Sequence, residues 1–131
     1  MILPLLMLIA AQDAPVDCDK ADTQLDMNIC AERDFEAADA ELNRQWKITY
    51  ARMRQDDGAY NQTRDRYDTS TDSAPALLES QRAWLKYRES YCIAESNRAR
   101  GGSMHAMLYS TCMTDLTTAR TAQLAEMIKE Q

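Results

Sequence analysis

The stretch QRAWLKYRESYC, residues 81–92, gathers side chains that can bind, pair or anchor within one short segment. Two arginines, a lysine, a tryptophan, two tyrosines and a cysteine occupy seven of its twelve positions. A guanidinium group can pair with a carboxylate through two parallel hydrogen bonds, and aromatic rings anchor cores and interfaces. The stretch is therefore a candidate catalytic cluster, a candidate binding surface or a polar part of the core.

The rest of the sequence offers little for catalysis. It contains no H-x-E, G-x-S-x-G, glycine-rich phosphate loop or Cys-His arrangement, and the single histidine, His105, is expected in a surface loop beside Gly101 and Gly102. Paired carboxylates could perform acid and base catalysis among so many acidic residues. We nevertheless assign no catalytic residue and no cofactor, and we predict that the protein is not an enzyme. An enzyme acting on cell-wall material is the weakest alternative.

The elements that must position these residues are helices. Only three glycines and three prolines occur, and long stretches are rich in helix-forming residues. The apolar spacing and the capping residues predict three helices, at Thr23 to about Met53, Pro75 to about Arg98, and Ser103 to about Ile128. Residues 56–74 lack an apolar period and predict a long flexible connection. We expect an all-α fold, a small up-down-up three-helix bundle.

An even number of cysteines in a short chain is typical of secreted, disulfide-bonded proteins, and this chain has Cys18, Cys30, Cys92 and Cys112. Zinc is the competing interpretation, but no C-x-x-C spacing occurs, so we assign no metal site. An antiparallel hairpin turning at the two adjacent glycines brings Cys92 opposite Cys112 and leaves Cys18 for Cys30. The rival pairing, Cys30 with Cys92 and Cys18 with Cys112, stays open.

Polar residues recur inside the apolar stripes of the expected helices. If the first two helices pack antiparallel with Asp39 against Arg88, then Asn43 falls opposite Trp84 and Trp46 opposite Gln81. A buried arginine is costly unless it is paired, so Asp39 is the expected partner of Arg88, and Arg120 can join from the third helix. We predict a structural polar network of Asp39, Asn43, Gln81, Trp84, Arg88 and Arg120.

A functional version of this network competes with the structural one. In it, Asp39, Arg88 and Arg120 line a groove that takes a charged group of a partner.

The charge of the chain is unevenly distributed. Residues 13–41 hold ten acidic side chains against Lys20 and Arg33, a balance of −8, whereas the whole chain has a formal net charge of −6. Nucleic acid and anionic lipid are thus poor partners, and a cationic protein is attracted to the first third of the chain. The candidate partner-binding residues, named from charge alone, are Asp34, Glu36 and Glu41. The alternative is an acidic face that only maintains solubility.

The first eleven residues, MILPLLMLIAA, have no charged side chain, and the sequence becomes acidic directly after them. This change predicts a secretory signal peptide, residues 1–11, cut near 11–14. The alternative is a buried N-terminal helix. A membrane-spanning helix is not expected, because the run is shorter than the roughly 20 apolar residues that span a bilayer. We expect residues 12–131 to form one domain that is periplasmic or secreted, without stable membrane insertion.

Several segments together resemble a known family. CDKADTQLDMNIC, DAELN, QRAWLKYRESYC, a further cysteine and TTARTAQL, in this order, resemble the lysozyme inhibitor LprI-like N-terminal domain family of bacterial envelope proteins. The similarity runs from Cys18 to about Leu124. It implies a secreted or envelope-attached, disulfide-bonded helical domain and, for the namesake member, an inhibitor of lysozyme. Asp17 stands where a lipoprotein needs a small residue, so we expect no lipid anchor.

Two functions of different classes follow. The leading hypothesis is a periplasmic or secreted binding module that inhibits a basic lysozyme. The alternative is a structural or assembly component of the cell envelope that binds another protein through residues 56–74. The sequence leaves the oligomeric state open.

Overall fold

The computed structural model describes residues 14–129, and the predicted signal peptide lies outside them. Three α-helices form nearly all of the described part: α1 (Gln24–Asn61), α2 (Ser73–Ser96) and α3 (His105–Glu126). Two short 3-10 turns, η1 (Cys18–Lys20) and η2 (Asn97–Ala99), precede α1 and follow α2. Residues 14–129 contain no β-strand, so the predicted all-α class is confirmed.

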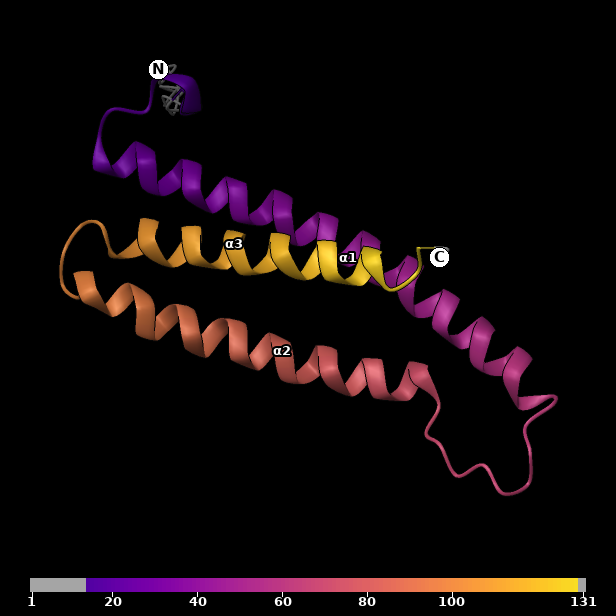
Figure 1. Ribbon diagram of the computed structural model, residues 1–131. Coiled ribbons are helices and arrows are strands. Elements are labelled where there is room, and N and C mark those ends of the chain that lie inside the picture. Colours follow the sequence, from indigo (N-terminus) through magenta and orange to yellow (C-terminus); the bar gives the residue numbers. More distant parts are fainter. Residues whose placement is uncertain (1–13, 130–131) are drawn as a thin grey trace, which may run out of the picture.

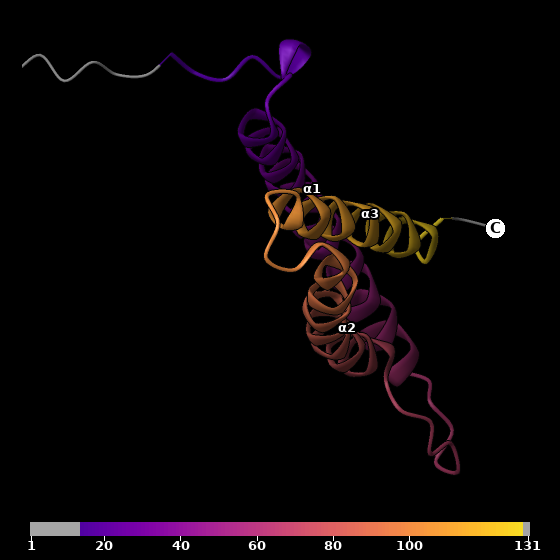
Figure 2. The ribbon, with the colours of Figure 1, turned by 90° about the vertical axis from the view of Figure 1, so that its left-hand side faces the viewer.

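The helices run up, down and up, as predicted, and α3 lies alongside both of the others (Figure 1). The packing of α3 on α1 is the most extensive helix–helix contact. Figure 2, turned by 90°, again places the start of α3 directly against α1. At 38 residues, α1 is the longest element and continues beyond the C-terminal end of α3 toward the connection with α2 (Figure 1).

The start of α1 agrees with the prediction, but its end does not. The hydroxyl of Thr23 accepts a hydrogen bond from the backbone N–H of Asp26 at 3.1 Å, which caps the helix. The helix then continues past Met53 to Asn61, so the predicted connection at 56–74 is too long at both ends. Its non-helical part is residues 62–72.

The last turns of α1, beyond Met53, are helical because one of their residues, Asp57, caps the start of α2. The carboxylate of Asp57 accepts hydrogen bonds from the backbone N–H groups of Ser73 and Ala74 at 2.8 and 2.7 Å. These bonds, chiefly the one from Ala74, lower the pKa of Asp57. An Arg52–Asp56 ion pair at 3.0 Å supports the same turns from the surface.

Side chains also tie residues 62–72 to the helices. Arg64 contacts Asp72 at 2.5 Å and Asp68 at 3.8 Å. The hydroxyl of Tyr60 donates to Asp68, and this bond, followed by those from Ser70, lowers the pKa of Asp68 to about 2. The connection is therefore held by hydrogen bonds and ion pairs.

The core contains one leucine from each helix. Leu42, Leu77 and Leu124 are 1%, 6% and 0% exposed, and Trp46, Met53 and Trp84 pack around them. Burying such side chains contributes about 1.5 to 3 kcal/mol each. Next to them, the hydroxyl of the buried Thr49 donates to the carbonyl oxygen of Leu124 at 2.9 Å, which joins α1 to α3.

Two disulfides fasten one end of the bundle. Cys18 pairs with Cys30 and Cys92 with Cys112, with Cα–Cα separations of 5.7 and 5.6 Å, so the preferred pairing is confirmed and the rival one is wrong. The first disulfide joins the N-terminal segment to α1, and the second joins α2 to α3. The reversal between α2 and α3 uses Gly101 at a φ of +79°, a conformation that side-chain-bearing residues rarely adopt.

Candidate functional site

Arg88 is the residue through which all three helices make polar contact. Its Nη1 lies 2.7 Å from Oδ1 of Asp39 on α1 and 2.8 Å from the hydroxyl oxygen of Thr117 on α3. The Asp39–Arg88 contact is the one that the predicted register requires. Arg88 has 11% of its side chain exposed and Asp39 has 34%, so the ion pair lies at the margin of the core.

Aromatic rings cover the faces of the Arg88 guanidinium. Its central carbon lies 5.0 Å from the ring centre of Trp84 and 5.3 Å from that of Phe35. The buried Nε of Arg88 has no hydrogen-bond partner within the described part of the chain. The attraction between cation and ring faces compensates part of the desolvation of this arginine.

Arg120 does not contact Asp39 and makes its own set of hydrogen bonds, but its guanidinium carbon lies 5.8 Å from the ring centre of Trp84, the ring that also lies against Arg88. It donates to Gln81 and Ser80 on α2, each at 2.9 Å, and to Gln123 on its own helix. Burial lowers the pKa of Arg120. Gln81 and Ser80 lie on α2 and Arg120 lies on α3, so these hydrogen bonds join the two helices.

One residue of the predicted polar network faces outward. Asn43 is exposed and donates to Asp39 within α1 at 3.4 Å. The inward side of α1 is instead the one that carries the buried Leu42 and Thr49, because α3 packs there. The stripe through Asp39 therefore lies at the edge of the interface.

The surface has an apolar groove at the end of the bundle that holds the disulfides. Its volume is about 650 Å³, and ten residues from three helices line it: Leu25, Asn28, Ile29, Glu32, Phe35, Ile93, His105, Ala106, Tyr109 and Ser110. Leu25 on α1 is 67% exposed and Ile93 on α2 is 48% exposed. None of Asp39, Arg88 and Arg120 lines this groove, so the functional version of the polar network has no support there.

His105 was expected in a surface loop but is the first residue of α3 and is half-buried. Its Nε2 lies 3.3 Å from the hydroxyl oxygen of Ser96 and 3.4 Å from the side-chain oxygen of Asn97. Ser96 is fully buried and donates to the carbonyl oxygen of Ile93 at 3.1 Å. A buried hydroxyl engaged in this way is not presented to a substrate, so this serine and histidine do not form a hydrolytic pair.

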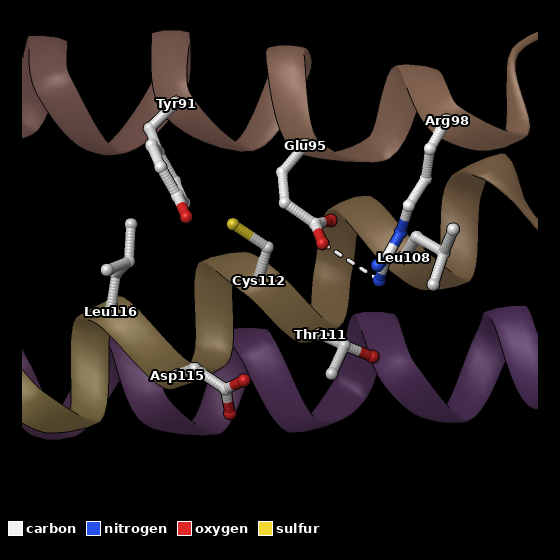
Figure 3. Close-up of a pocket in the computed structure, with 8 residues that line it drawn as sticks. All are labelled: Tyr91, Glu95, Arg98, Leu108, Thr111, Cys112, Asp115 and Leu116. Carbon is white, nitrogen blue, oxygen red and sulfur yellow. Dashed lines mark ion pairs between the residues drawn. The ribbon is translucent and has the colours of Figure 1, made fainter.

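A second, smaller hollow of about 250 Å³ lies between α2 and α3 and is drawn in Figure 3. Glu95 and Arg98 form an ion pair at 2.8 Å on its α2 side, and Asp115 lies across from them on α3. The charged groups in this hollow are of mixed sign, and its arginine is already paired. The apolar groove is therefore the better candidate for a binding site.

The three acidic residues named from charge do not form one cluster. Asp34 and Glu41 are two helical turns apart and share one side of α1, and Glu41 is paired with Arg44. Glu36 lies on the other side, one turn after Glu32, which lines the groove. Glu32 is not among the residues predicted from the sequence, although its spacing of seven from Leu25 and three from Ile29 indicates a shared helix face.

Residues 14–129 were compared with the requirements of metal sites and membrane-spanning helices. This part of the chain contains no group of three or more histidine, cysteine or acidic residues that could hold a metal ion. None of its helices combines the length and the apolar character required to span a bilayer. Each of the four cysteines is in a disulfide.

Comparisons with known proteins agree with this architecture. A family model described as lysozyme inhibitor LprI matches residues 17–124, which include both disulfides and most of the three helices. The chain is 42% identical over 119 residues to an uncharacterized protein of Rhizobium meliloti (strain 1021), an alignment that covers 91% of this chain and 84% of that protein. No solved structure gives a significant match. The chain therefore belongs to the lysozyme inhibitor LprI family.

Proposed function

We propose that this protein is a secreted or periplasmic binding module that inhibits a cationic lysozyme, either by covering its cleft or by blocking its approach to the cell wall. The observation that carries the proposal is the family match over residues 17–124. The two disulfides support a location outside the cytoplasm, where such bonds persist. In this proposal the protein acts by binding and performs no catalysis.

The charge of α1 supports the choice of a cationic target. Between Gln24 and Glu41 this helix holds six acidic side chains against one basic side chain, Arg33. The guanidinium of Arg33 is engaged with the carbonyl oxygen of Val16 at 2.7 Å. A surface of this sign raises the rate of encounter with a basic protein, and the rate falls as salt screens the charges.

Asp34, Glu36 and Glu41 are proposed to contribute to this attraction. Asp34 and Glu36 are exposed, and Glu41 is half-buried. Long-range attraction does not require that all three carboxylates touch the partner, because the field of the whole helix acts over about 8 to 10 Å in physiological salt. Their positions on two sides of α1 are compatible with that role.

The test is an assay of cell-wall lysis by a cationic lysozyme, with and without the purified, oxidised protein. We expect slower lysis at an equimolar ratio in low salt and weaker inhibition at physiological salt. A matched sample that has been reduced and alkylated serves as the control for folding. Undiminished lysis at tenfold excess in low salt, across a panel of cationic lysozymes, contradicts the proposal.

A further inference from the structure

We propose that the apolar groove receives the partner, and that its occupant is a surface loop of a cationic protein in which a large apolar side chain is next to a lysine or arginine. This inference rests on the proposed function and names the surface through which that function acts.

The rim of the groove is formed by exposed apolar side chains. Leu25 and Ile93 project from two different helices and are 67% and 48% exposed. The side chains of Ile29, Phe35 and Tyr109 add apolar and aromatic surface to the lining. Contiguous exposed apolar surface of this kind marks interaction sites, and the volume of about 650 Å³ is within the range of binding pockets.

The charge of the groove restricts the occupant. Glu32 is a lining residue, Glu36 continues the same side of α1 one turn later, and the lining contributed by residues 14–129 contains no lysine or arginine. A purely apolar segment would leave these carboxylates facing an uncharged surface. A basic group beside the inserted side chain would pair with them, which gives both affinity and specificity.

A second copy of the chain is a poorer occupant for the same reason. Two grooves brought together would place the Glu32 and Glu36 carboxylates of both copies in one interface without a lysine or arginine among the described lining residues. Like charges placed against each other in an interface weaken it. The observations therefore favour a cationic partner.

The inner end of the groove is supported by the polar contacts of Arg88. Phe35 lines the groove, and its ring centre lies 5.3 Å from the guanidinium carbon of Arg88. Arg88 is held in turn by Asp39 and Thr117. This ion pair thus positions a wall of the groove and does not itself contact the occupant.

The first test removes the apolar rim. The variant Leu25→Gln/Ile93→Gln is titrated calorimetrically with a cationic lysozyme that the wild-type protein inhibits, and we expect Kd to rise about tenfold or more. The matched control is Ile48→Gln/Leu85→Gln, whose residues are 51% and 41% exposed on the same two helices outside the groove. The control should bind like the wild type.

The second test leaves the rim intact. Ala106 is exposed on the α3 wall, and Ala106→Trp should fill the groove without removing a buried side chain. We expect this variant to fold normally by circular dichroism and to lose binding by about tenfold or more. Because this variant keeps the rim side chains and its folding is verified, a loss of binding shows that the groove itself is required and that misfolding is not the cause.

The third test distinguishes carboxylates that pair with the bound partner from carboxylates that only attract it at long range. Glu32→Gln/Glu36→Gln and Asp34→Asn/Glu41→Gln each remove two negative charges, from the groove side and from the opposite side of α1. Surface plasmon resonance should show faster dissociation for the first variant only. Slower association at low salt is expected for both.

The outcomes distinguish the two proposals. If the wild type binds lysozyme and the rim, filling and Glu32/Glu36 variants bind equally well, the groove is not the site and only this inference falls. If the wild type binds no lysozyme in the panel, the proposed function and this inference fall together. Self-association of the wild type that the rim variant abolishes would identify a second copy as the occupant and would also overturn the inference.

Discussion

Arg88 of α2 and Asp39 of α1 form an ion pair at 2.7 Å although they are 49 residues apart in sequence. Because Arg88 also donates to Thr117 of α3, one guanidinium group links all three helices. The pair is asymmetric, since Arg88 is nearly buried whereas Asp39 keeps 34% of its side chain exposed. Most of the desolvation therefore falls on the arginine.

The variant Arg88→Met should lower the free energy of unfolding by about 1 to 3 kcal/mol, the usual cost of leaving buried hydrogen-bonding groups without a partner. The larger loss typical of fully buried ion pairs is not expected, because Asp39 retains contact with solvent. Urea denaturation measures the change. Arg82→Met, on the exposed side of α2, is the control and should be nearly neutral. A change for Arg88→Met within about 0.5 kcal/mol would show that the pair contributes little.

Removal of the Cys92–Cys112 disulfide, in Cys92→Ala/Cys112→Ala, should lower the stability by about 2 to 4 kcal/mol. Cys92 is 0% exposed and the bond closes a separation of 20 residues between two helices, so both packing and chain constraint are lost. The matched variant Cys18→Ala/Cys30→Ala should unfold at a denaturant concentration closer to that of the wild type. Cys18 is exposed, and its bond joins α1 to the N-terminal segment. Equal losses in guanidinium denaturation would contradict this ranking.

Stability should depend on Asp68 in acid. Hydrogen bonds, chiefly from Tyr60, lower the folded-state pKa of Asp68 from 3.8 to about 2. Its stabilising contribution is therefore complete above pH 3.8 and is lost as the pH falls toward 2, where the folded state also takes up the proton. In Asp68→Asn this contribution is missing at every pH. Thermal unfolding of the two proteins should differ at pH 6 and converge near pH 2, and an equal difference at both pH values would refute the assignment.

The capping role of Asp57 gives a local prediction. Asp57→Asn should increase the exchange of the Ser73 and Ala74 amide hydrogens, because the carboxylate that accepts from both is lost. Hydrogen exchange followed by NMR measures this effect directly. Asp56→Asn is the control, since Asp56 only pairs with Arg52 on the surface. Unchanged exchange at both amides would mean that water replaces the cap.

The sequence predicted the features that depend on local pattern. Thr23 begins α1 because its hydroxyl can cap the helix, and a Gly-Gly reversal places Cys92 opposite Cys112. The Asp39–Arg88 pair also followed from helical spacing, since antiparallel packing leaves few registers that match polar groups. The first two depend on residues close in sequence or on one symmetric hairpin, and the third depends on the helical periodicity of two segments.

Features that depend on distant partners were missed. Residues 54–61 contain Gly58 and two aspartates and look like a connection, yet they remain helical because Asp57 meets the start of α2 in space. Arg120 was expected to join the Asp39–Arg88 pair, but within the predicted network it donates to Gln81 and shares only the ring of Trp84 with Arg88. Glu32 was not singled out, because the groove that it lines exists only once three helices meet.

Both disulfides lie at the end of the bundle that carries the groove, with Cys30 adjacent to Ile29 and Cys92 adjacent to Ile93. The groove walls therefore lose most of their conformational entropy when the chain folds and oxidises, and little remains to be lost on association. Affinity for a partner should then depend on the redox state of the surroundings. In an oxidising compartment the groove is preorganised, whereas reduction would loosen its walls without changing any residue that faces the partner.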